Sequence, residues 1–165
     1  MSVVRRVVSG GQTGADRAAL DAARDAGISH GGWCPAGGLA EDLPEPPGLL
    51  ARYPGLRETD ATDPAERTVL NVRDSDATLA VVPSGSPTGG TLLAVQEAAR
   101  LGRPCLVTSG DDPAAVTDWL SATGQGLTLN VAGPSESTEP GAYDITRRLL
   151  EAVLGAVLGR ASTDG

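Results

Sequence analysis

Two glycine-rich segments carry the residue types best suited to binding an anion. They are residues 9–16 (SGGQTGAD) and residues 84–91 (SGSPTGGT). Glycine lets the main chain approach a ligand closely, and the unpaired N–H groups in the first turn of a helix attract phosphate. Taken singly, either segment could be a tight turn without a ligand. The predicted ligand contacts are Gly10, Gly11, Gln12, Thr13, Gly14, Asp16, Thr88, Gly89, Gly90 and Thr91.

Each segment is expected to join a strand to a helix. Residues 3–8 are short and valine-rich, as in a strand, and alanines recur at helical spacing over residues 15–26. Residues 77–82 form a continuous apolar run typical of a central parallel strand, and a helix is expected over residues 91–101. Ligands of open α/β sheets bind at the carboxyl ends of the strands. We therefore expect both segments to line one crevice.

The remaining elements complete an alternation of strands and helices. Strands are expected at 30–34, 104–108 and 127–131, and helices at 63–74, at 113–122 and after a polar loop at 133–141. This order predicts a Rossmann-like three-layer α/β sandwich, with a mostly parallel sheet of about five strands flanked by helices. Residues 35–63 lack periodicity and are expected to form a functional loop. We expect one domain over residues 1–160 and a flexible tail over residues 161–165.

Composition limits the possible functions. The net charge is −8, which disfavours nucleic acid as a partner. All 13 basic residues are arginines, and the lack of lysine excludes a Walker-A loop and a pyridoxal-phosphate Schiff base. His30, Cys34 and Cys105 are too few soft ligands for a typical zinc site, so no metal is expected. No apolar run is long enough for a membrane span. Residues 1–6 run straight into the expected strand and lack the apolar region of a signal peptide, so we expect a cytoplasmic protein.

Several short motifs resemble those of a known family. The chain resembles the putative molybdenum carrier family, within a wider group of Rossmann-like domains that includes the cytokinin-activating phosphoribohydrolases and the DNA-processing protein DprA. The resemblance covers roughly residues 3–107. It rests on residues 10–17 (GGQTGADR), 32–35 (GWCP), 40–42 (AED), 53–54 (YP), 66–68 (ERT), 71–72 (NV), 74–77 (DSDA) and 88–91 (TGGT).

The resemblance implies a ligand site at the two glycine-rich turns. The family's name implies a ligand like the molybdenum cofactor, a phosphorylated pterin, whereas the wider group implies a nucleotide. Relatives are commonly dimers, which implies a homodimer or a higher homo-oligomer.

The same resemblance raises the alternative of an enzyme. In the phosphoribohydrolases an arginine stands about nine residues before an Asp-Ala pair, as Arg67 does here before Asp76 and Ala77. Their catalytic glutamate position is occupied by Ala94, which weakens the enzymatic reading. Glu97 lies one helical turn further on, where it could face the sheet with Arg67 as its partner or lie on the surface.

Three functions stay open at this point. The leading hypothesis is a carrier or sensor that binds a phosphate-bearing small molecule. The alternative is a nucleotide N-glycosidase of the phosphoribohydrolase type, with Arg67 and either Glu97 or Asp16 as catalytic residues. The third is a structural module of a larger complex. Less favoured roles are base stacking by Trp33 and divalent-cation binding by Glu41 and Asp42.

Overall fold

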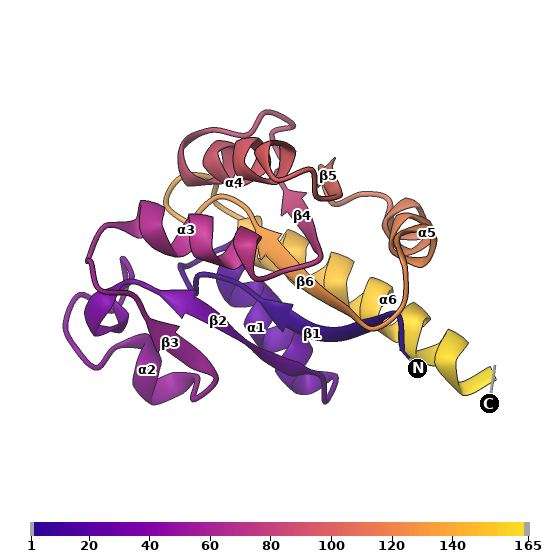
Figure 1. Ribbon diagram of the computed structural model, residues 1–165, viewed down its shortest axis with the longest axis horizontal. Helices are drawn as coiled ribbons and strands as arrows, with labels where there is room; N and C mark the ends of the chain where they lie inside the picture. Colours follow the sequence, from indigo (N-terminus) through magenta and orange to yellow (C-terminus); the bar gives the residue numbers. More distant parts are fainter. Residues whose placement is uncertain (1, 164–165) are drawn as a thin grey trace.

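A single parallel sheet forms the centre of the molecule (Figure 1). The computed structural model describes residues 2–163, with side chains described up to residue 159. The strands are β1 (Val4–Val8), β2 (Ser29–Cys34), β3 (Leu56–Glu58), β4 (Ala77–Val81), β5 (Cys105–Thr108) and β6 (Leu127–Ala132). Their order in the sheet is β3-β2-β1-β6-β4-β5, and every pair is parallel. The Rossmann-like α/β prediction is confirmed, with six strands where about five were expected.

Helices cover both faces of this sheet, which completes the three layers (Figure 1). One face carries α1, α5 and α6; α6 packs against both α1 and α5, and the three helices share the largest apolar core with the strands. The other face carries α3 and α4, which pack on each other over a smaller apolar cluster. The helices are α1 (Ala15–Asp25), η1 (Ala36–Gly38), α2 (Leu49–Arg52), α3 (Pro64–Arg73), α4 (Gly89–Arg100), α5 (Pro113–Thr123) and α6 (Ala142–Thr163).

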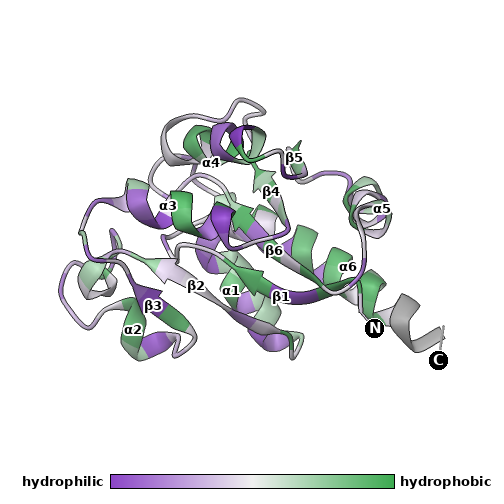
Figure 2. Ribbon diagram, viewed as in Figure 1, coloured by the Kyte–Doolittle hydropathy of each residue, from purple (hydrophilic) through white to green (hydrophobic). Residues whose placement is uncertain are grey.

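The core is built from small and branched aliphatic side chains. The inner face of α1 is made of buried alanines, which lets α6 pack closely along it. On α6, Leu149, Leu150, Val153 and Leu154 are at most 1% exposed, and Figure 2 colours much of this helix green, for hydrophobic residues. The helix continues to Thr163, and residues 164–165 of the expected tail lie outside the described residues.

The segment expected to be one long loop contains regular structure. Residues 35–63 include η1, α2 and β3, and β3 pairs with β2 at the edge of the sheet. Leu49 and Leu56 are buried in a separate cluster beside Leu20 and Cys34. Periodicity could not reveal these elements because each has only three or four residues, and their burial against β2 and α1 stabilises them.

The strand order places a switch in chain direction at the centre of the sheet. From β1 the chain passes outward to β2 and β3, then continues on the other side through β4 and β5, and β6 finally inserts between β1 and β4. The loop after β1 leads to α1 on one face, and the loop after β4 leads to α4 on the other. In open α/β sheets, such a switch point opens a crevice at the carboxyl ends of the strands.

Within residues 2–163, no helix combines the length and apolar character that crossing a membrane requires.

Candidate functional site

A cavity of about 500 Å³ lies at this switch point. Both glycine-rich segments line it: Gly10, Gln12 and Asp16 come from the first, and the second contributes the turn at residues 88–91. Residues of α3, including Arg67, and the chain after β6 complete the wall. The volume falls within the range of small-molecule sites in proteins. The two segments therefore converge on one space.

The second glycine-rich turn presents unpaired donors to the cavity. Thr88 is the N-cap of α4, and its carbonyl accepts from the N–H groups of Thr91 and Leu92. Among the described residues, no acceptor is recorded for the N–H groups of Gly89 and Gly90. A Cβ at Gly90 would meet only the Thr68 hydroxyl, at 3.9 Å. The start of α4 therefore offers both donors and room for an anion.

The first glycine-rich turn has a different role, because the protein itself uses several of its N–H groups. The Ala15 N–H donates to the Pro134 carbonyl at 3.2 Å, and the Thr13 N–H donates to Gln12 Oε1 at 3.0 Å. The Gln12 N–H donates to the Asp16 carboxylate.

This turn therefore forms part of the cavity wall, and it has fewer unpaired N–H groups than the sequence suggested. Gly11, Thr13 and Gly14 lie outside the lining of the cavity. Thr13 and Gly14 instead line a smaller hollow with Arg17, Tyr53 and Tyr143.

Arg67 and Asp16 form a buried ion pair in the cavity wall. Arg67 Nη1 lies 2.9 Å from Asp16 Oδ2, and the two side chains are 11% and 10% exposed. Arg67 Nε also donates to the Pro64 carbonyl at 3.3 Å. A guanidinium has five N–H groups, so further donors remain for a ligand. Burial raises the pKa of the Asp16 carboxyl, although Arg67 opposes the shift.

Gly10 makes this ion pair possible. An added Cβ would lie 1.7 Å from Arg67 Nη1 and 2.6 Å from Arg67 Cζ. The Arg67 guanidinium thus occupies the space that any other residue at position 10 would need.

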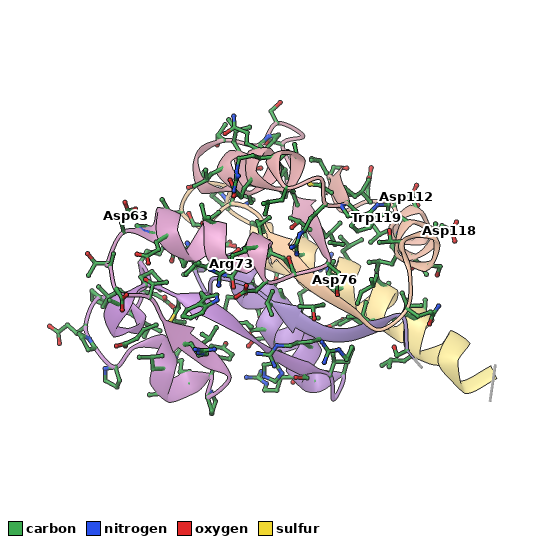
Figure 3. The ribbon with its side chains drawn as sticks, viewed as in Figure 1. Asp63, Arg73, Asp76, Asp112, Asp118 and Trp119 are labelled. Carbon is green, nitrogen blue, oxygen red and sulfur yellow. The ribbon has the colours of Figure 1, made fainter. Side chains whose placement is uncertain are left out.

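The helix that carries Arg67 is held in place at its start and beyond its end. Asp63 accepts from the Ala65 N–H at 2.9 Å, which caps α3. After the helix, the Asp76 carboxylate accepts from the Thr128 N–H at 2.7 Å, tying the start of β4 to β6. Figure 3 shows Asp63 at the start of α3, Arg73 on it, and Asp76 on the segment that leads to β4.

Glu97 does not pair with Arg67, which was one of the two alternatives that the sequence left open for it. Glu97 is only 8% exposed, but it pairs with Arg100 one turn further along α4. Hydrogen bonds from Arg100 lower the pKa of the Glu97 carboxyl. Ala94 lines the cavity and Glu97 does not. The carboxylate that contacts Arg67 is therefore that of Asp16 and not that of Glu97.

Trp33, Glu41 and Asp42 lie away from the cavity lining. The Trp33 indole N–H donates to Asp74 at 2.8 Å, and the Arg57 guanidinium stacks over its ring at 4.6 Å. Glu41 accepts from the Thr13 and Ser137 hydroxyls. Asp42 accepts two hydrogen bonds from Arg17, at 2.8 and 2.9 Å. The contacts of Glu41 and Asp42 fasten the loop after η1 to the first glycine-rich turn, to α1 and to the chain after β6.

Local sequence patterns did not reveal the contribution of α3 and β6 to the cavity beyond Arg67. Asn71 of α3 and Asn130 of β6 line the cavity, as do Pro134, Ser135 and Thr138 after β6. The available signal was an asparagine in an otherwise largely apolar strand, LTLNVA. Its meaning depended on the central place of β6 in the sheet.

Comparison with known proteins agrees with the motif resemblance. The model of a family described as the circularly permutated YpsA SLOG family matches residues 7–154. A crystal structure from Syntrophus aciditrophicus SB, titled "Putative molybdenum carrier protein", is similar over 93% of this chain and 96% of that one. It has 37% sequence identity and a TM-score of 0.83. No curated protein matches the chain.

Proposed function

This chain belongs to the circularly permutated YpsA SLOG family, and we propose that it binds a phosphate-bearing small molecule in the cavity, as a carrier or sensor. The proposed ligand classes are a nucleotide and a phosphorylated pterin of the molybdenum-cofactor type. The similar crystal structure is that of a putative molybdenum carrier protein, which supports a carrier role.

The observation that carries the proposal is the convergence of both glycine-rich segments on one cavity. The ligand's phosphate would bind at the start of α4, where the Gly89 and Gly90 N–H groups lack a protein acceptor among the described residues. The remaining N–H groups of Arg67 would supply charge-assisted hydrogen bonds. Gln12, Thr88 and Thr91 add neutral polar groups to the lining.

Charge in the cavity favours a ligand with few negative charges. Among the described residues, Arg67 and Asp16 are the only charged ones in its lining, and they neutralise each other. Main-chain dipoles and a single partly committed guanidinium are therefore left to offset the ligand's charge. A monophosphate suits this arrangement better than a triphosphate.

Gly90→Ala tests this proposal without a steric or backbone penalty. Its φ lies outside the left-handed region and its Cβ would enter open space, so the variant is expected to fold normally. The added methyl would occupy the space in front of the α4 N-terminus and weaken phosphate binding at least about tenfold, which is about 1.4 kcal/mol. Gly155→Ala, on α6 with an equally open Cβ position, is the matched control.

The measurement is isothermal titration with inorganic phosphate, AMP and GMP, supported by thermal shift. A ligand at one hundred times its Kd stabilises the folded protein by about 2.7 kcal/mol. The wild type and Gly155→Ala should bind alike and Gly90→Ala should bind weakly. Absence of binding by the wild type, or equal binding by all three proteins, would contradict the proposal.

A nucleotide N-glycosidase is the second candidate, and the Arg67–Asp16 pair favours it. Burial raises the pKa of the Asp16 carboxyl, and a carboxyl with a raised pKa can act as a general acid. It would protonate the departing base as the N-glycosidic bond breaks, while a water molecule adds to the ribose carbon and returns a proton to Asp16. Incubation with AMP followed by chromatography for free adenine tests this role. The activity should vanish in Asp16→Asn and persist in Glu97→Gln. Intact AMP after prolonged incubation with the wild type would rule it out.

We also propose that the protein is a cytoplasmic homodimer, as the resemblance to dimeric relatives suggested. Light scattering after size-exclusion chromatography measures the mass directly. A value near 16.6 kDa, the mass of one chain, would contradict the dimer.

A further inference from the structure

We propose that Asn130 recognises the edge of a planar nitrogen heterocycle in the ligand, and so determines which phosphorylated compounds bind. This inference rests on the proposed function and adds a specificity-determining residue to it. The phosphate contact at the start of α4 is common to all phosphate esters, whereas Asn130 would distinguish among them.

The position of Asn130 is unusual for a polar side chain. It belongs to β6, the strand between β1 and β4 near the centre of the sheet, and it is 3% exposed. Burying a polar group costs free energy unless it is hydrogen-bonded. The protein supplies one long hydrogen bond, from Asn130 Nδ2 to Thr78 Oγ1 at 3.3 Å. The protein therefore satisfies only part of the hydrogen-bonding capacity of the Asn130 amide.

The remaining polar atoms of Asn130 face the cavity. An asparagine amide has two N–H groups and a carbonyl oxygen that can accept two hydrogen bonds. Within the described residues, the fully buried side-chain polar atoms without a partner are Ser2 Oγ and Thr146 Oγ1. Asn130 Oδ1 has no recorded partner and is not among these atoms. Since Asn130 lines the cavity, its carbonyl oxygen is accessible from there, and the second N–H of Nδ2 has no acceptor among the described residues.

Asn71, the other amide in the lining of the cavity, bonds to the protein through both of its polar atoms. Its Oδ1 accepts from the Trp33 N–H at 2.8 Å, and its Nδ2 donates to the Trp33 carbonyl at 2.9 Å. These two hydrogen bonds fix the orientation of the Asn71 amide and hold the end of β2 in place. Asn130 makes only one hydrogen bond to the protein, and its Oδ1 makes none, so more of its amide is available to a ligand.

The chemistry of a free amide edge points to a heterocycle. A carbonyl oxygen beside an N–H matches the adjacent acceptor and donor on a nucleobase or pterin ring, the pairing by which asparagine recognises adenine. No aromatic side chain of the described part of the chain lines the cavity, so the ring face has no stacking partner from these residues. Specificity for the ring would then depend on its edge.

The test compares GMP and AMP with ribose 5-phosphate, which keeps the sugar phosphate and lacks the ring. By titration calorimetry, the wild type should bind at least one nucleotide about tenfold or more tightly than ribose 5-phosphate. Asn130→Leu, similar in size and without polar atoms, should lose that preference while its affinity for ribose 5-phosphate stays unchanged. Gly90→Ala should weaken both kinds of ligand.

Thr78→Val gives an independent check if Asn130→Leu does not fold. It keeps the shape of a buried β4 residue and removes the anchor of Asn130, so the nucleotide preference should fall several-fold. Equal binding of nucleotides and ribose 5-phosphate by the wild type would overturn the inference, as would an undiminished preference in a folded Asn130→Leu or Thr78→Val protein. If the wild type binds nucleotides and ribose 5-phosphate equally, only the role of Asn130 fails. If the wild type binds none of these compounds, the proposed function fails as well.

Discussion

Substitution of Gly10 by alanine should destabilise the protein by breaking the Arg67–Asp16 ion pair. The φ of Gly10 lies outside the left-handed region, so alanine adds no backbone strain. Its Cβ would lie 1.7 Å from Arg67 Nη1 and 2.5 Å from Arg67 Cδ. The guanidinium must move, and Asp16 is then left as a buried carboxylate without its partner.

The cost can be bounded from the chemistry of Asp16. Removing one member of a buried ion pair typically costs about 3–5 kcal/mol. Asp16 can avoid this cost by taking up a proton. From an ordinary pKa of 3.8, protonation costs about 1.4 kcal/mol per pH unit. The upper limit is therefore about 4.4 kcal/mol at pH 7 and about 1.6 kcal/mol at pH 5.

The sign of the pH dependence follows from the direction of the pKa shift. Losing Arg67 leaves burial as the dominant effect, so the pKa of Asp16 in the folded variant rises further above its unfolded value. A raised carboxyl pKa favours folding fully below the unfolded pKa, and this advantage is lost as the pH rises through the folded value. The stability deficit of Gly10→Ala should therefore be largest at neutral pH and shrink toward pH 5.

Urea unfolding at pH 5 and pH 7 measures both quantities. The double variant Gly10→Ala/Asp16→Asn removes the carboxylate, so its stability deficit should vary much less with pH than that of the single variant. Gly155→Ala controls for the added methyl group. A Gly10→Ala protein as stable as the wild type at pH 7, or one whose deficit is the same at both pH values, would refute this reasoning.

Three further outcomes are expected. Hydrogen bonds from Ser137 and Thr13 lower the pKa of Glu41, so Glu41→Gln should slightly lower Tm at pH 7, and the difference from wild type should disappear as calorimetric scans move to acid pH; a constant difference would contradict this. Cys34 is 0% exposed, and burial raises the pKa of its thiol to about 11. Iodoacetamide should therefore label Cys34 at pH 8 only as fast as the protein unfolds; rapid labelling would show that Cys34 is not buried. Binding of AMP at Arg67 should raise the pKa of Asp16 further, so the protein should take up protons on binding. Comparing the calorimetric binding enthalpy in Tris and PIPES buffers detects this uptake, and AMP affinity should increase as the pH falls. Both effects should be smaller in Asp16→Asn.

Local sequence signals predicted the strand–turn–helix units that frame the cavity. Valine runs, alanine spacing and glycine-rich turns act within a few residues of one another, so β1 with α1 and β4 with α4 were identifiable without tertiary information. The parallel sheet followed from the alternation of these elements. The motif resemblance, now confirmed by the family match over residues 7–154, also required only the sequence.

Tertiary structure decided which chemical groups meet in the cavity. The contact between Arg67 and Asp16 spans 51 residues, and that between Asn130 and Thr78 spans 52. The Asn130–Thr78 contact depends on β6 pairing with β4, and the Arg67–Asp16 contact depends on α1 and α3 both packing against β2; no local pattern records either arrangement. For the same reason, the sequence alone could not show that Pro134 occupies an N–H group of the first glycine-rich turn while the second turn stays open.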